Sequence, residues 1–109
     1  DGDVEKRFTK DELLTTITIY WVTESISSST RLYYETLHRP WELGQNEGIR
    51  VPCAVAVFPK ELSIPPREWA ERSYNVQHWT VMPSGGHFAA LEEPARLVED
   101  IRDFFRPLR

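Results

Sequence analysis

The feature that most constrains the fold is a turn with two glycines and a histidine, set between an apolar run and an amphipathic stretch. Residues 76–82 form the alternating apolar run, Gly85 and Gly86 precede His87, and residues 94–108 carry the amphipathic pattern. This order predicts a strand, a tight turn and a helix. Open α/β sheets place their chemistry at the carboxyl ends of strands, and glycines allow positive φ and close backbone approach. We therefore predict that the turn places the His87 imidazole just beyond the carboxyl end of a strand.

A second apolar run, residues 51–58, is followed directly by Pro59, Lys60 and Glu61. Nearly continuous apolar sequence is typical of a strand that is covered on both faces. Two successive strand ends would bring a carboxylate and an imidazole to the same edge of a sheet, the acid first. This order is the closing half of the nucleophile, acid and histidine series of α/β-hydrolases. Spacing alone also leaves Glu68 open as the acid, although we expect it on the surface of a short helix.

A carboxylate that faces a histidine has a definite chemical use. The carboxylate accepts the Nδ1 proton and fixes the tautomer, which leaves Nε2 able to take a proton from water or from a nucleophile. A lone turn histidine is more often structural, so the upstream acid is what favours a catalytic His87. We expect structural roles for the other two histidines, His38 in a loop and His78 in a strand.

The first third of the chain is predicted to be helical. Residues 9–12 match a capping box ahead of an apolar face, although residues 15–19 are β-branched and alternating and would also suit a strand. A second helix over residues 26–37 would carry Arg31 and Glu35 one turn apart as a surface pair.

The remaining segments connect and cover the two strands. Residues 38–50 contain a proline and two glycines and are predicted to form a loop that Trp41 anchors by burial. A short helix that starts at residues 64–66 and ends near residues 74–75 supplies the crossover that parallel strands need. In the last helix we expect the charged residues, Asp100 among them, to be solvated. The apolar residues of that helix predict one buried stripe, formed by Leu97, Val98, Ile101, Phe104, Phe105 and Leu108.

Charge and composition argue against several classes of protein. With a net charge of −4 and no basic stripe, the chain is not expected to bind nucleic acid. Cys53 is the single cysteine, which excludes an internal disulfide, and its apolar neighbours indicate a small core residue. No apolar run approaches the roughly 20 residues of a membrane span and no signal peptide is present. We therefore expect a cytoplasmic chain, with a membrane anchor upstream left open.

A length of 109 residues allows one small domain, but the sequence offers only two convincing strands. Both are expected to be buried and parallel, and two parallel strands cannot cover both faces and both edges of a sheet. We therefore expect neighbouring strands from outside these residues. The chain also begins at Asp1 without an initiator methionine, which is consistent with a fragment.

Segments along the whole chain resemble microsomal-type epoxide hydrolases, which are α/β-hydrolases with a helical cap. Residues 85–94, Gly-Gly-His-Phe-Ala-Ala-Leu-Glu-Glu-Pro, closely resemble the family's histidine motif, and residues 58–62 resemble its acid motif. The spacing between the two motifs is close to that of the family. Residues 11–14 with 19–21, and then residues 28–35, resemble the end of its cap domain.

The resemblance implies an α/β fold, as a C-terminal fragment of an α/β-hydrolase. Residues 41–109 would supply the last two parallel strands and their helices, and residues 1–40 the helices that end the cap domain. His87 would be the general base, Glu61 its acid partner, and Tyr33 a cap tyrosine whose hydroxyl donates to the epoxide oxygen. Family enzymes open the epoxide with an aspartate, and water activated by the histidine then hydrolyses the alkyl-enzyme ester. The implied partners are a small apolar epoxide and water, and the implied role is detoxification. The resemblance implies no cofactor and no metal.

Departures from the family pattern leave alternatives open. The chain has no Gly-x-Asp-x-Gly or Gly-x-Ser-x-Gly elbow, so the nucleophile is expected on a missing N-terminal part and the 109 residues alone are expected to be inactive. Lys60 stands where we expect an apolar residue, and Tyr34 beside Tyr33 leaves the choice of phenol open. One alternative is another capped hydrolase, an esterase or a haloalkane dehalogenase. The other is a non-catalytic module that pairs through its open sheet edges, with a second copy in a homo-oligomer or with a partner.

Overall fold

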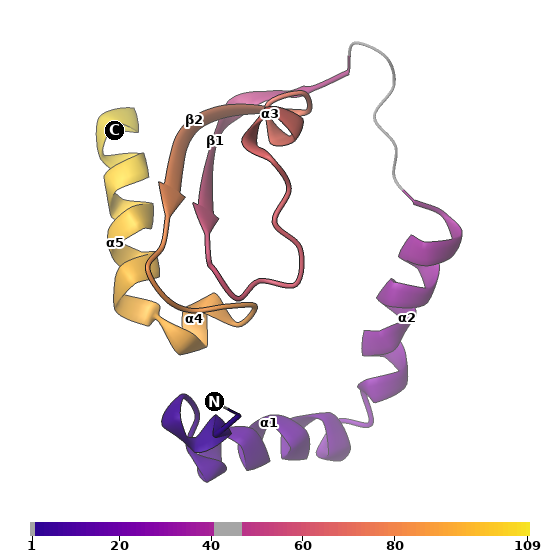
Figure 1. Ribbon diagram of the computed structural model, residues 1–109. Coiled ribbons are helices and arrows are strands. Elements are labelled where there is room, and N and C mark those ends of the chain that lie inside the picture. The colour runs from indigo at the N-terminus through magenta and orange to yellow at the C-terminus, as the bar shows by residue number, and fades with distance from the viewer. Residues whose placement is uncertain (1, 41–46) are drawn as a thin grey trace. The chain divides into compact units, whose positions relative to one another are not determined.

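A computed structural model describes residues 2–40 and 47–109 of the chain (Figure 1). The chain divides into two compact units, Asp1–Glu42 and Leu43–Arg109. The predicted anchoring role of Trp41 lies outside the described residues. None of the helices in the described ranges combines the length and the apolar character that crossing a membrane requires.

The first unit consists of a 3-10 turn, Val4–Lys6, and two helices, α1 (Lys10–Val22) and α2 (Ile26–His38). The capping box predicted at the start of α1 is confirmed. The Glu12 amide donates to Thr9 Oγ1 at 3.2 Å, and the Thr9 amide donates to the Glu12 carboxylate at 2.8 Å. The bond from the Thr9 amide, and after it the bond that Thr9 Oγ1 donates to the same carboxylate at 2.8 Å, lower the pKa of Glu12. The strong helix start therefore decides against a strand for the β-branched residues that follow.

The second helix also matches its prediction, except that it extends to His38, which was expected in the loop. Arg31 Nε lies 2.6 Å from Glu35 Oε1 across one turn, as predicted. Neither helix buries a residue within the described parts of the chain. Large apolar side chains stay exposed along both helices, among them Leu14, Ile17, Trp21, Leu32 and Leu37. Helices with this much uncovered apolar surface gain stability when other elements pack on them.

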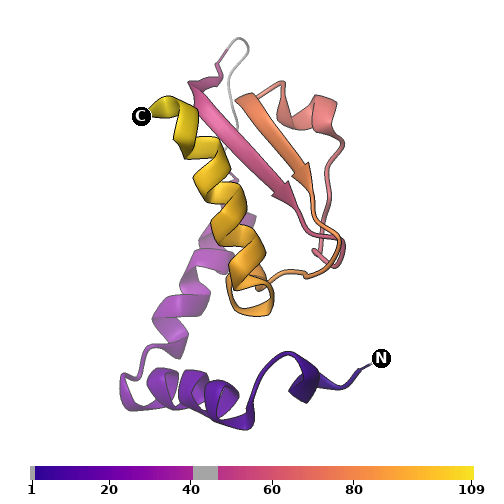
Figure 2. The same ribbon diagram turned by 90° about the vertical axis from the view of Figure 1, so that its left-hand side faces the viewer.

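The second unit is built on two parallel strands, β1 (Ile49–Val57) and β2 (Tyr74–Val81), which confirms the predicted pair. Helix α5 (Pro94–Phe105) lies along one face of this sheet (Figure 2). The β1–β2 crossover, with the short helix α3 (Arg67–Ala70), lies on the other side (Figure 1). Helix α4 (Ala89–Glu92) precedes α5, and a 3-10 turn, Arg106–Leu108, ends the chain.

The crossover helix is shorter than predicted, because strand β2 begins where the helix was expected to end. Asn75 was expected to terminate the helix, but it lies in β2 and its side-chain amide donates to the Arg50 carbonyl at 2.8 Å. The ladder register shifts between Ile49 and Pro52, since proline has no backbone N–H to donate. Asn75 supplies a donor beside this irregularity, and this long-range bond favours an extended backbone there.

The core of the second unit is small. Among the described residues the buried apolar side chains are Phe58, Met82 and Phe104, and none is buried to below 2% exposure. The stripe predicted to be buried on α5 stays largely open, because Val98, Ile101, Phe105 and Leu108 are 42–52% exposed. Asp100 was expected in solvent, yet it is the buried polar residue of this helix, at 8% exposure. The unit therefore presents exposed apolar surface of the kind on which further elements pack.

Candidate active site

The acid-bearing loop after β1 and the histidine turn after β2 are held together by backbone pairing beyond the strands. The Met82 amide donates to the Val57 carbonyl at 2.8 Å, and the Lys60 amide donates to the Gly85 carbonyl at 3.0 Å. Lys60 and Gly86 then form an isolated parallel bridge. The two segments thus run side by side from the strand ends, at the sheet edge where the sequence predicted the site.

Both glycines before the histidine are required by their surroundings, as predicted. Gly85 has φ of +97°, and a Cβ there would lie 2.8 Å from the Phe58 ring. At Gly86 a Cβ would lie 2.8 Å from the Lys60 carbonyl oxygen, closer than an ordinary contact. The turn can approach the acid loop this closely because neither position carries a side chain.

Glu61 and His87 meet at the end of this pairing. His87 Nδ1 lies 2.7 Å from Glu61 Oε1, and the Leu62 amide donates to the same carboxylate oxygen at 2.6 Å. The hydrogen bond from His87, and after it the Leu62 amide, lower the pKa of Glu61. The carboxylate is therefore ionised near neutral pH, and a protonated Nδ1 donates to it. This tautomer directs the lone pair of Nε2 away from the acid.

Two carboxylates that follow the turn in the chain hold its backbone in place. Ser84 Oγ donates to Glu93 Oε1 at 2.6 Å, and Arg96 lies 3.3 Å from the other Glu93 oxygen. The Phe88 amide donates to Glu92 Oε1 at 2.9 Å, which closes α4 directly after the histidine. The backbone on both sides of His87 is thus tied down by carboxylates that the sequence assigned no role.

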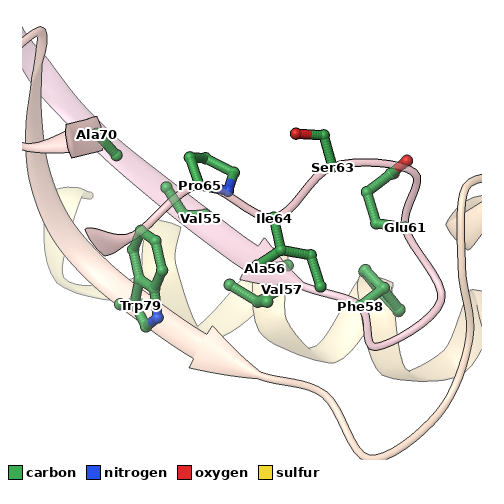
Figure 3. A pocket seen from close by; sticks show the side chains of 10 residues that line it. All are labelled: Val55, Ala56, Val57, Phe58, Glu61, Ser63, Ile64, Pro65, Ala70 and Trp79. Atoms are coloured by element: carbon green, nitrogen blue, oxygen red, sulfur yellow. The ribbon is translucent and has the colours of Figure 1, made fainter. Parts of the chain in front are cut away.

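A small cavity of about 110 Å³ lies between the sheet and the crossover loop, on the side away from α5 (Figure 3). Glu61 and Ser63 supply polar atoms at one end, and Trp79 and Ala70 lie toward the other (Figure 3). The remaining walls are apolar: Val55, Ala56, Val57, Phe58, Ile64 and Pro65. The acid of the pair therefore stands beside an apolar recess.

The two candidate tyrosines differ in their surroundings within the first unit. The Tyr34 ring stacks on His38 with ring centroids 4.0 Å apart, and His38 Nδ1 lies 2.7 Å from the Tyr34 carbonyl oxygen. Tyr33 is 68% exposed and shows no ring stacking of this kind among the described residues. The catalytic role of Tyr33 stays a prediction.

A second histidine–carboxylate pair lies on the α5 face of the sheet. His78 Nε2 lies 2.7 Å from Asp100 Oδ1, and Thr80 Oγ1 lies 2.8 Å from the same nitrogen. The sequence assigned His78 no special chemistry and placed Asp100 in solvent. The sequence did carry a signal for the burial of Asp100, since position 100 lies three residues after Leu97 and four before Phe104, within the apolar stripe.

Within residues 2–40 and 47–109, no group of three or more His, Cys, Asp or Glu side chains is arranged to hold a metal ion.

Cys53 Sγ lies 3.2 Å from the Val51 carbonyl oxygen and is partly exposed, so it is not the buried core residue that was predicted.

Two parallel strands that end in an acid and then a histidine, with helices on their flanks, define the C-terminal part of an α/β-hydrolase fold. No protein-family model matches the chain. The chain is 43% identical to epoxide hydrolase 1 of Sus scrofa over 95% of its length, and 42% identical to that of Oryctolagus cuniculus over 95%. It is 43% identical to juvenile hormone epoxide hydrolase 2 of Ctenocephalides felis over 93%.

The chain spans about a quarter of the length of these curated relatives, 24%, 24% and 22% respectively. It is therefore a homologue of epoxide hydrolases that corresponds to one portion of them, consistent with a C-terminal fragment of such an enzyme.

Proposed function

We propose that the chain is the water-activating portion of an epoxide hydrolase that converts epoxides to vicinal diols. The observation that carries the proposal is the 2.7 Å contact between His87 Nδ1 and Glu61 Oε1, at the ends of two parallel strands. The names of the relatives favour an epoxide as substrate over an ester or a haloalkane. On this proposal the 109 residues alone are inactive, since the nucleophile lies on another part of the enzyme.

The proposed reaction has two stages. First, an aspartate carboxylate oxygen attacks one ring carbon, the carbon–oxygen bond of the ring breaks, and the released oxygen takes a proton from a tyrosine. Tyr33 is the proposed donor, because the Tyr34 ring is already stacked on His38. The product of this stage is an ester between the enzyme and the substrate.

Water opens the ester in the second stage. His87 Nε2 takes a proton from the water as its oxygen attacks the ester carbonyl carbon, while Glu61 stabilises the imidazolium that forms. The tetrahedral intermediate collapses, and the departing diol oxygen takes the proton back from His87. The regenerated carboxyl group loses its remaining proton to the tyrosinate, which restores both residues.

The test is a hybrid enzyme in which these 109 residues replace the segment that they match in the Sus scrofa epoxide hydrolase 1. With styrene oxide as the probe, the hybrid should form the diol, and Glu61→Gln should lower the rate by roughly 100-fold. His38→Gln is the matched control and should leave the rate unchanged. Equal diol formation by Glu61→Gln and the parent hybrid would refute the proposed role.

A further inference from the structure

The pair formed by His78 and Asp100 joins the two arms of the segment that carries His87. His78 lies on β2, which precedes the histidine turn, and Asp100 lies on α5, which follows the turn after the short helix α4. The 2.7 Å contact between His78 Nε2 and Asp100 Oδ1 therefore closes a loop whose far end holds the proposed general base. A hydrogen bond in this place constrains where the turn stands relative to the sheet.

The chemistry of the pair suits a directional link. The Asp100 side chain is 8% exposed and the His78 side chain 29% exposed, so the contact is largely shielded from water. A buried carboxylate needs a donor, and a protonated His78 Nε2 supplies one. The Thr80 hydroxyl, 2.8 Å from the same nitrogen, holds the ring from the next position on that face of the strand.

Apolar packing between α5 and the sheet is incomplete, so a hydrogen bond can contribute to the position of the helix. An open groove runs between them, lined on β1 by small side chains, Cys53, Ala54 and Ala56. On the helix side the groove is lined by Leu97, Ile101, Phe104 and Phe105 as well as Asp100. Because this groove leaves the apolar packing between helix and strand incomplete, a short hydrogen bond adds a directional constraint on where the helix lies.

We propose that His78 and Asp100 are positioning residues for the water-activating step, a role that rests on the proposed function. They fix α5 on β2 and thereby hold the histidine turn where His87 meets Glu61. Neither residue touches the reacting atoms. The loss of the link should therefore slow hydrolysis of the ester, which needs His87, and leave formation of the ester, which does not, nearly unchanged.

The experiment uses the hybrid enzyme with styrene oxide and measures the rate constants of ester formation and ester hydrolysis separately by rapid quench. His78→Leu should slow hydrolysis by roughly 10- to 100-fold while ester formation changes less than about twofold. His78→Gln, whose side-chain amide can still donate to Asp100, should keep hydrolysis close to the parent rate.

A variant with both His78→Leu and Asp100→Leu separates positioning from simple stability. This double variant has no buried carboxylate that lacks a donor, so its urea unfolding midpoint should lie close to that of the parent. Its ester hydrolysis should nevertheless stay slow. If His78→Leu or the double variant slows ester formation and ester hydrolysis equally, or slows neither, the positioning role is wrong. If Glu61→Gln in the same hybrid leaves hydrolysis unchanged, the proposed function fails, and the positioning role fails with it.

Discussion

The close approach of the histidine turn to the acid loop makes Gly86→Ala a sharp perturbation. The added Cβ would lie 2.8 Å from the Lys60 carbonyl oxygen, 3.0 Å from Lys60 Cβ and 3.2 Å from its carbonyl carbon. Ordinary contact begins at 3.4 Å, so the two backbones must part by about 0.6 Å at this point. His87 follows Gly86 directly and Glu61 follows Lys60, so the separation falls on the 2.7 Å contact between their side chains.

A displacement of this size should slow ester hydrolysis in the hybrid enzyme by roughly tenfold, since a shift of about 1 Å can cost about 100-fold. The matched control is Gly48→Ala, where the added Cβ would meet the Ser73 carbonyl oxygen at 3.6 Å, an ordinary contact. That variant should hydrolyse the ester at the parent rate. Single-turnover kinetics measures both variants, and parent-rate hydrolysis by Gly86→Ala would refute the reasoning.

Three further predictions concern other residues. Thr9→Ala should destabilise α1 by about 1 kcal/mol, seen as an earlier loss of helical circular dichroism in urea. Tyr33→Phe should slow ester formation by roughly 100-fold while Tyr34→Phe leaves it unchanged, and equal rates for the two would reject Tyr33 as the donor. The pKa of Glu61 is lowered from 4.5 in the folded state, so its ionised form adds stability above that pH and the contribution disappears as the pH falls through the lowered pKa. Urea midpoints of Glu61→Gln and the parent should therefore converge as the pH falls below 4.5 and through the lowered pKa, and a constant gap would contradict the linkage.

Local signals in the sequence were sufficient for most of the elements. Strand, turn and helix around His87 follow from hydrophobic periodicity and two glycines, and the start of α1 follows from Thr9 and Glu12. The contact between Glu61 and His87 could be predicted because parallel strands place their carboxyl ends at one edge.

Long-range contacts account for what could not be predicted. The crossover helix ends early because Asn75 binds the backbone of the other strand, and no local pattern contains that partner. The charge of Asp100 predicts a position in solvent although the residue lies in an apolar stripe, and only the fold brings His78 to it. The stripe on α5 was expected to be buried, but Ile101 and Phe105 remain 45% and 51% exposed, because periodicity marks an apolar face without showing what packs on it.

The central claim is that His87 activates the water that releases the diol, and intact-protein mass spectrometry of the His87→Ala hybrid tests it most directly. After mixing with styrene oxide, this variant should gain the mass of one epoxide per enzyme molecule and keep it, while the parent hybrid shows only a transient adduct. The result that would contradict the account is diol formation by His87→Ala at the parent rate, without an accumulated adduct.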